Sequence, residues 1–296
     1  MATLEQAAAD VPGHVGIAAR HLDSREELHL RSDEAYFTAS TFKVPILAEV
    51  YRQVDAGLID PDQRVTVLDE LRAPGSGVLK EMAAGLRPTV HDLALLMIII
   101  SDNTATDTLY HMVGRDRLNE TMQDLGLSRT RLPMSCREML YSMCGVDTED
   151  IERGNEMVAS ALALQKVVPG SPGLSEDHGD VSSPADMIKL LQAVYDGEVH
   201  SPGSREAVMD ILRRQQATTI IPADLPPGTD VAHKTGGVPT VRCDVGIVFS
   251  PSGPYTIAIM AKNVTDVKSI VRRLAAVSRA VYDHFNPRVA LPFALA

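Results

Sequence analysis

The chain has 296 residues, of which 45% are hydrophobic and 23% are charged, as expected of one large domain or two closely packed lobes. Its formal net charge of −11 argues against nucleic acid or an anionic membrane surface as a partner, because both need concentrated Lys and Arg. Trp is absent and aromatic residues make up only 4%, so the core must consist mainly of aliphatic side chains and Met.

The N-terminus does not resemble a secretion signal, because no basic start precedes an apolar run and Glu5 and Asp10 interrupt the alanines. The longest apolar run, over 93–100, is too short to span a bilayer. We therefore expect a cytoplasmic monomer with no membrane partner. A secreted or periplasmic location is expected instead if a leader has been removed.

Hydrophobic periodicity predicts strands near both ends of the chain and helices between them. In chain order we expect a helix over 3–11, strands over 15–19 and 27–31, helices over 42–51, 93–100, 103–112 and 183–195, strands over 231–235, 241–250 and 255–261, and a helix over 267–281. Thr89 and Asp92 resemble a capping box, and Ser183 followed by Pro184 is a typical helix start.

This order predicts an α+β fold with two lobes. The N-terminal hairpin would join the late strands in one antiparallel sheet flanked by helices, so residues 1–39 and 201–296 would form one discontinuous α/β lobe. Residues 40–200 would form a mostly helical lobe with an extended omega-like loop over about 130–182. A cleft between two such lobes is a usual place for a functional site.

The cysteines and histidines do not predict a metal site or a cofactor. Cys136, Cys144 and Cys243 are odd in number and form no CxxC pair, so free and mostly structural thiols are expected. Cys136 and Cys144 are close enough in sequence to pair, but spacing alone leaves this open. The nine His residues have no metal-ligand spacing.

Three short motifs carry the chemical information: Ser40-Thr41-Phe42-Lys43, Ser101-Asp102-Asn103 and Lys234-Thr235-Gly236. Together they supply a serine nucleophile, two ammonium groups, further hydroxyls and a carboxamide, which is the set needed to open an amide through an acyl-serine intermediate. Each motif alone more commonly has a structural meaning: a helix cap, a turn or a glycine bulge on an edge strand. Their joint occurrence, in this order and on these elements, favours the catalytic interpretation.

The trio resembles that of the serine β-lactamase and penicillin-binding protein superfamily, and more narrowly that of class A β-lactamases. The resemblance implies that Ser40 is acylated, that Lys43 is its base or proton relay and that Ser101 protonates the β-lactam nitrogen. It also implies substrate-binding roles, for Asn103 toward the acylamide, for Lys234, Thr235 and Gly236 toward the carboxylate, and for the Gly237 N–H with that of Ser40 toward the oxyanion. Arg242 is a further candidate for the carboxylate, and an ordinary surface arginine is an equal alternative.

The loop after the second motif departs from class A. That class places a glutamate there, followed four residues later by an asparagine, to activate the water that releases the acyl group. Alignment on Thr130-Arg131-Leu132 puts Cys136 at the glutamate's position, and Glu138 is the nearest acid, with Ser142 four residues on. The segment from Ser101 to Ser183 is also longer than the class implies, so extra sequence within 142–180 should remodel the loop. Glu149, Glu152 and Glu156 in it are expected to be solvated helix charges.

The sequence therefore predicts a class A β-lactamase-like serine hydrolase with a small-molecule substrate, no cofactor and no metal. Glu138 is the candidate for the deacylating base. Three alternatives stay open: a slowly deacylating penicillin-binding or D-alanyl peptidase-like enzyme, an esterase or amidase on the same scaffold, and a non-hydrolytic protein that captures β-lactam or peptide ligands.

Overall fold

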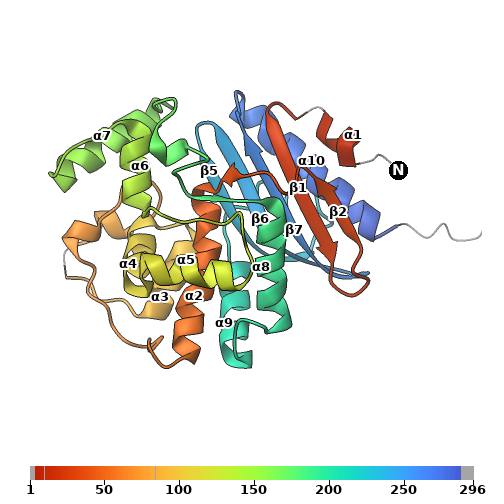
Figure 1. Ribbon diagram of the computed structural model, residues 1–296, viewed down its shortest axis with the longest axis horizontal. Helices are drawn as coiled ribbons and strands as arrows, with labels where there is room; N and C mark the ends of the chain where they lie inside the picture. Colours follow the sequence, from red (N-terminus) through yellow and green to blue (C-terminus); the bar gives the residue numbers. More distant parts are fainter. Residues whose placement is uncertain (1–3, 10, 84, 288–296) are drawn as a thin grey trace, which may run out of the picture.

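One antiparallel sheet joins the two ends of the chain, as the computed structural model shows for residues 4–9, 11–83 and 85–287 (Figure 1). The spatial order of its strands is β2-β1-β7-β6-β5. The N-terminal hairpin therefore adds to one edge of the late three-stranded meander. The bounds are β1 His14–His21, β2 Glu27–Leu30, β5 Asp230–Val238, β6 Val241–Ser250 and β7 Gly253–Lys262.

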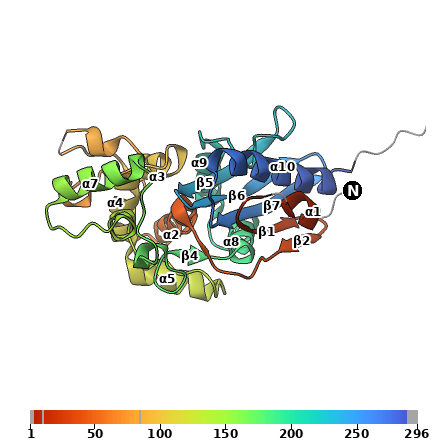
Figure 2. The ribbon, with the colours of Figure 1, turned by 90° about the horizontal axis from the view of Figure 1, so that it is seen from above.

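The two faces of this sheet serve two different cores, because successive side chains point to opposite faces. Ile17 and Ile259 lie opposite each other on β1 and β7 and belong to the core under the C-terminal helix α10 (Val267–Phe285). Ala18 and Ala258, one step along, belong to the core shared with the helical lobe. Figure 2 shows α10 and the short α1 (Leu4–Ala9) on the same side of the sheet.

The helical lobe is built around α2 (Lys43–Asp55), whose buried residues include both apolar and polar side chains. Helices α3 to α6 follow α2 in this lobe (Figure 1). Their bounds are α3 Val90–Ile99, α4 Asn103–Val113, α5 Arg115–Asp124 and α6 Cys136–Cys144. Two helices that follow, α8 (Pro184–Asp196) and α9 (Pro202–Arg213), pack against strands of the sheet, α8 on β1, β6 and β7 and α9 on β5.

The predicted α+β architecture is confirmed, with strands at both ends of the chain and helices between. Thr89 and Asp92 form a reciprocal capping box at the start of α3, and the Ser183 hydroxyl accepts from the Asp186 N–H at the start of α8. Thr3 and Asp10 of the predicted N-terminal helix lie outside the described residues. The sequence assigned residues up to 200 to the helical lobe, which includes α8. In the structure α8 packs on strands of the sheet.

The extra sequence within 142–180 forms helix α7 (Ile151–Ala163) and the short 3₁₀ helix η4 (Pro172–Leu174). The segment then returns beside the nucleophile motif, where β4 (Val181–Ser182) pairs with β3 (Tyr36–Phe37). The loop's far end is thereby fixed next to the strand that leads into Ser40. In residues 4–9, 11–83 and 85–287, no helix is long and apolar enough to cross a membrane.

Candidate active site

The Ser40 backbone is fixed by its neighbours on both sides. Ser40 lies in the 3₁₀ turn η1 (Ala39–Phe42), and Ala39 before it has a positive φ of 43°. Such left-handed backbone is strained in a residue with a Cβ and persists only where contacts enforce it. Here the Thr38 N–H and hydroxyl both donate to the Asp180 carbonyl, at 3.0 Å each, and the Thr41 hydroxyl donates to the Thr38 carbonyl at 2.7 Å.

Lys43, the first residue of α2, directs its ammonium group at the second motif. Nζ donates to the Ser101 carbonyl at 2.8 Å, to Ser101 Oγ at 2.9 Å and to Asn103 Oδ1 at 2.7 Å. These three acceptors match the three N–H bonds of an ammonium group. The structure thus connects Lys43 with both polar ends of the second motif.

Lys43 and the strand lysine Lys234 are both fully buried. Burial lowers the pKa of Lys43, while Cys136, Asp102 and Asp107 nearby oppose the fall. Burial also lowers the pKa of Lys234, well below its usual value, and the positive charge of Lys43 lowers it further. Neither lysine forms an ion pair within the described part of the chain, so both ammonium groups favour an anion or proton loss.

The second motif is held by its own polar side chains. Ser101 has a positive φ of 59°, at the tight connection between α3 and α4. Asp102 caps α4 by accepting from the Ala105 N–H at 2.9 Å, and its other oxygen accepts from the N–H groups of Val78 and Leu79. The motif is therefore tied to the 78–79 segment as well as to its own helix.

Asn103 is buried, and both ends of its carboxamide are engaged. Oδ1 accepts from Lys43, and Nδ2 donates to the Pro74 carbonyl at 2.7 Å. Its backbone N–H donates to the Ser76 carbonyl at 3.0 Å. This geometry makes Asn103 a link between Lys43 and the 74–76 segment, and its predicted contact with a substrate acylamide stays a prediction.

The third motif completes the site on the edge strand β5. A Cβ on Gly236 would lie 2.9 Å from the Ser40 nitrogen, so only glycine lets the strand approach the nucleophile this closely. Ser40, Ser101, Thr235, Gly236 and Gly237 all line one pocket of about 400 Å³. Residues of all three motifs thus line one pocket in the described structure, whereas the two buried lysines are not part of the lining.

Arg242 lies opposite Gly237 in the β5–β6 register. Its guanidinium is half buried and donates to the backbone carbonyls of Val238 and Val241, the latter at 2.6 Å. It is not among the residues that line the pocket. Carboxylate binding by Arg242 accordingly stays a prediction.

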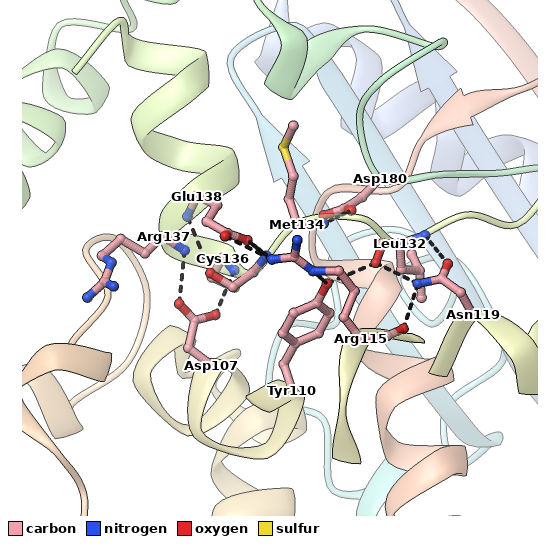
Figure 3. A network of polar contacts seen from close by, with 11 residues as sticks. Asp107, Tyr110, Arg115, Asn119, Leu132, Met134, Cys136, Arg137, Glu138 and Asp180 are labelled. Atoms are coloured by element: carbon pink, nitrogen blue, oxygen red, sulfur yellow. Dashed lines mark hydrogen bonds and ion pairs between the residues drawn. The ribbon is translucent and has the colours of Figure 1, made fainter. Parts of the chain in front are cut away.

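Glu138 does not lie at the pocket that the three motifs line. Its carboxylate forms a double hydrogen bond with Arg115, at 2.9 Å to each oxygen, and closes a capping box with Ser135 at the start of α6 (Figure 3). The side chain is 46% exposed and does not line the pocket. Two structural roles therefore account for Glu138, and the geometry gives no support for its predicted role as deacylating base.

Cys136 is the residue of this loop that comes closest to the lysine network. Its thiol is buried and donates to Asn103 Oδ1 at 3.4 Å, the same oxygen that accepts from Lys43. Burial raises the pKa of the Cys136 thiol, so it is a neutral group at this position. All three cysteines are free, which answers the open question about Cys136 and Cys144.

Two buried carboxyl groups anchor the loop, as Figure 3 shows. Asp107 accepts from the backbone N–H of Cys136 at 2.6 Å and of Arg137 at 3.0 Å, and Asp180 accepts from that of Met134 at 3.0 Å. Burial raises the pKa of Asp107 to about 6, although both N–H groups oppose the rise. Burial raises the pKa of Asp180 well above its usual value. Sequence reasoning missed both residues, since a lone Asp in a helix or loop has no diagnostic pattern.

The remaining pocket wall was also not predicted. It consists of Ser76, Ile99, Ile100 and the 215–217 segment after α9. Gln215 is fixed there by donating to the Ile98 carbonyl at 2.9 Å. Apart from Ile99, the last residue of α3, these residues come from connections between regular elements, where sequence periodicity carries little information.

Comparisons with known proteins agree with this geometry. A family model described as "Beta-lactamase enzyme family" matches residues 1–285. The chain belongs to the β-lactamase enzyme family. Among the solved structures it resembles that titled "Structure of PBP-A", with 29% identity, a TM-score of 0.79 and coverage of 96% of this chain and 94% of that one. It also resembles the β-lactamase from Sphaerobacter thermophilus, with 27% identity, a TM-score of 0.79 and coverage of 98% and 96%.

Two curated relatives differ in their described roles. The extended-spectrum β-lactamase PER-1 of Pseudomonas aeruginosa is 27% identical over 263 residues, covering 84% of this chain and 75% of its own. The β-lactamase regulatory protein BlaB of Streptomyces cacaoi is 24% identical over 262 residues, covering 82% and 83%. The family therefore includes both hydrolases and a protein named for regulation.

Proposed function

We propose that this protein is a class A-like serine hydrolase that opens a β-lactam amide through an acyl-enzyme at Ser40. The observation that carries the proposal is the convergence of all three motifs on one pocket, with Lys43 Nζ bonded to Ser101 Oγ. Membership of the β-lactamase enzyme family supports it. A structure similar to this chain, titled as a mutant of PBP-A, is an acyl-enzyme complex with penicillin G.

The proposed reaction uses these groups in the following order. Ser40 Oγ attacks the lactam carbonyl carbon as its proton passes to Lys43 in its neutral form. The N–H groups of Ser40 and Gly237 stabilise the oxyanion. When the C–N bond breaks, the nitrogen takes a proton from Ser101 Oγ, which is replenished across the 2.9 Å contact from Lys43. The product is an ester on Ser40 with the amine still tethered.

Substrate binding is assigned to the third motif. Lys234 is buried without a carboxylate partner in the described residues and lies beside Thr235, which lines the pocket. A β-lactam carries a carboxylate that can supply the missing negative charge. We assign this carboxylate to Lys234 and Thr235, with Arg242 opposite Gly237 as a further cation at that end.

Release of the acyl group is proposed to be slow. The residues that line the pocket in the described structure include no Asp or Glu. A neutral thiol, Cys136, lies beside the Lys43–Asn103 contact, and Glu138 is held by Arg115. This arrangement also favours the second candidate function, a penicillin-binding enzyme whose acylated form persists.

The test combines turnover and intact mass. Wild type and Ser40→Ala are mixed with a chromogenic cephalosporin and with benzylpenicillin. We expect stoichiometric acylation of the wild type, slow turnover, and neither for Ser40→Ala. Rapid turnover without a detectable adduct would contradict slow release of the acyl group and indicate efficient hydrolysis instead. An adduct that survives in Ser40→Ala, or no adduct and no turnover in folded wild type, would reject the proposed nucleophile.

A further inference from the structure

The helix formed by the extra sequence, α7, touches the segment that forms one wall of the pocket. Asn155 on α7 donates from Nδ2 to the Arg72 carbonyl at 3.2 Å. A Cβ on Gly75 would lie 3.9 Å from Leu162, near the other end of α7. We name residues 72–76 the wall segment. It has α7 on one side and, through Ser76, the pocket on the other.

The opposite side of the wall segment holds the second motif. The Ala73 N–H donates to Thr104 Oγ1 at 3.1 Å, the Pro74 carbonyl accepts from Asn103 Nδ2 at 2.7 Å, and the Ser76 carbonyl accepts from the Asn103 N–H at 3.0 Å. Asn103 Oδ1 in turn accepts from Lys43. A continuous path of hydrogen bonds and backbone therefore runs from Asn155 to the ammonium of Lys43.

Close packing does not fix the wall segment on its α7 side. A cavity of about 650 Å³ lies there, lined by residues that include Pro74, Gly75, Glu152 and Asn155. Close-packed interiors hold their parts by many contacts, and a cavity removes them. On its α7 side the wall segment is thus held by the hydrogen bond from Asn155 to the Arg72 carbonyl and by the approach of Leu162 to Gly75, whereas its other side is tied to the second motif.

The orientation of Asn155 is itself set by a second residue. The Tyr141 hydroxyl on α6 lies 3.1 Å from the Ile151 carbonyl and 3.0 Å from Asn155 Oδ1. With Oδ1 facing this hydroxyl, Nδ2 faces the Arg72 carbonyl. A Cβ on Gly154 would lie 2.2 Å from the Tyr141 hydroxyl, so the glycine makes room for it.

We propose that Asn155 is a positioning residue: by holding the Arg72 carbonyl it fixes the wall segment, and through it the Asn103 carboxamide and the Lys43 ammonium, for acylation of Ser40. The inference rests on the proposed function for its catalytic consequence. It gives the extra helix α7 a role in the reaction although α7 contributes no residue to the pocket lining.

The decisive variant is Asn155→Asp. The substitution keeps the acceptor toward Tyr141 and the size of the side chain, but it removes the donor and places a carboxylate against the Arg72 carbonyl. Tyr141→Phe tests the same contact from the other side by releasing Asn155 Oδ1. Glu152→Gln is the matched control, because Glu152 lies on α7, is exposed and lines the same cavity.

Acylation by a fluorescent penicillin is measured across the pH range, with the binding and acylation steps separated. We expect Asn155→Asp to lower the acylation rate constant about tenfold and to change ligand affinity little. In the plot of acylation rate against pH, the limb that reports the titration of Lys43 should move to lower pH. The shift has this sign because a displaced Asn103 no longer accepts from the ammonium form. The other groups around Lys43, namely Lys234, Asp102, Asp107 and Cys136, are the same in every variant.

Tyr141→Phe should give the same changes to a smaller extent, and Glu152→Gln should match the wild type. Wild-type rates and an unchanged pH limb in folded Asn155→Asp would overturn the proposal. So would a rate loss with no movement of the limb, since a general loss of stability predicts that pattern. If Asn155→Asp does not fold, the Tyr141→Phe profile decides in the same way.

A readout without acylation separates this inference from the proposed function. The pKa of Lys43 is measured by carbon NMR of labelled lysine side chains in unreacted wild type and variants. A lower pKa in Asn155→Asp supports the positioning role even if no penicillin acylates the wild type, an outcome that would reject the proposed function alone. An unchanged Lys43 pKa overturns the positioning role in either case.

Discussion

The pocket and the loop over 131–180 differ in what their polar side chains do. Around the pocket, the three short motifs supply Ser40 and Ser101 to the lining, and their lysines, Lys43 and Lys234, are buried. In the loop over 131–180, backbone N–H groups are bound by two buried carboxyl groups, Asp107 of α4 and Asp180, and Glu138 serves as a cap and an ion-pair partner. The groups proposed for attack come from the motifs at the pocket, whereas the polar contacts of the loop anchor the loop itself.

We infer from this difference that the groups proposed for acylation and those that would serve release belong to different parts of the fold. Attack needs groups from α2, the α3–α4 connection and β5, which the two lobes bring together directly. Release needs a base placed by the loop, and the loop places the neutral Cys136 beside Asn103. Each of the following substitutions tests one side of this comparison.

The largest effect is expected from Lys43→Met. Removing the amino group takes away the proposed proton acceptor, which is its neutral form, and leaves Ser101 and Asn103 without their shared donor. We expect the acylation rate to fall by about 10²–10⁴-fold, the usual range for general acid–base groups. Stopped-flow acylation with a fluorescent penicillin measures it, and circular dichroism checks the fold. A rate within threefold of the wild type would contradict the assigned role.

A slightly smaller loss is expected from Gly236→Ala. The added methyl group would lie 2.9 Å from both the Ser40 nitrogen and the Thr38 carbonyl, so β5 or the nucleophile turn must move. We expect about a 10²-fold lower acylation rate, because oxyanion donors act only when correctly placed. Gly203→Ala is the control, since a Cβ there meets nothing within 4 Å. Equal rates for the two variants would show that this close approach is unimportant.

The loop side is tested by the pH dependence of stability. The folded-state pKa of Asp107 is about 6 against a reference of 3.8, so protonation favours the folded state. Relative to Asp107→Asn, the wild type should therefore lose about 2–3 kcal/mol of unfolding free energy as the pH rises from 4 to above 6. Urea unfolding at several pH values measures this. A pH-independent difference would mean that the Asp107 carboxyl is not desolvated as described.

Cys136→Glu should supply part of what release of the acyl group lacks, a base near the pocket. A carboxylate at this buried position lies beside the Lys43–Asn103 contact and can accept a proton from an attacking water. We expect the acyl-enzyme lifetime to shorten about tenfold, with Cys136→Ser unchanged. Intact mass after a penicillin pulse gives the lifetime. If both variants release at the wild-type rate, the position of Cys136 does not limit release.

The smallest effect is expected from Glu138→Gln. The Arg115–Glu138 pair is exposed, so its loss should cost about 0.2–1 kcal/mol of stability. Acyl-enzyme lifetime should not change, because Glu138 does not line the pocket. Clearly slower release of the acyl group would mean that Glu138 takes part in release, and would contradict a purely structural role for this residue.

The fold was predictable from the sequence, and the three motifs could be recognised there, because their signals are local. The runs of Val, Ile and Tyr in β6 and β7 follow from burial on both faces of the sheet, and the helical spacing in α10 follows from burial on one face. Thr89 and Ser183 cap helices through neighbours three residues away. The role of Glu138 was not predictable, because its partner Arg115 lies on another helix. The link from Asn155 to Arg72 is equally invisible in sequence, since a backbone carbonyl carries no residue identity.

One time course tests the central claim that Ser40 is acylated faster than it is released. Wild-type protein receives a single equivalent of benzylpenicillin, and intact mass and the peptide containing Ser40 are followed. The account predicts a stoichiometric adduct on Ser40 that forms quickly and persists long after the free ligand is gone. A mass that never changes, or an adduct that disappears as fast as it forms, would contradict it.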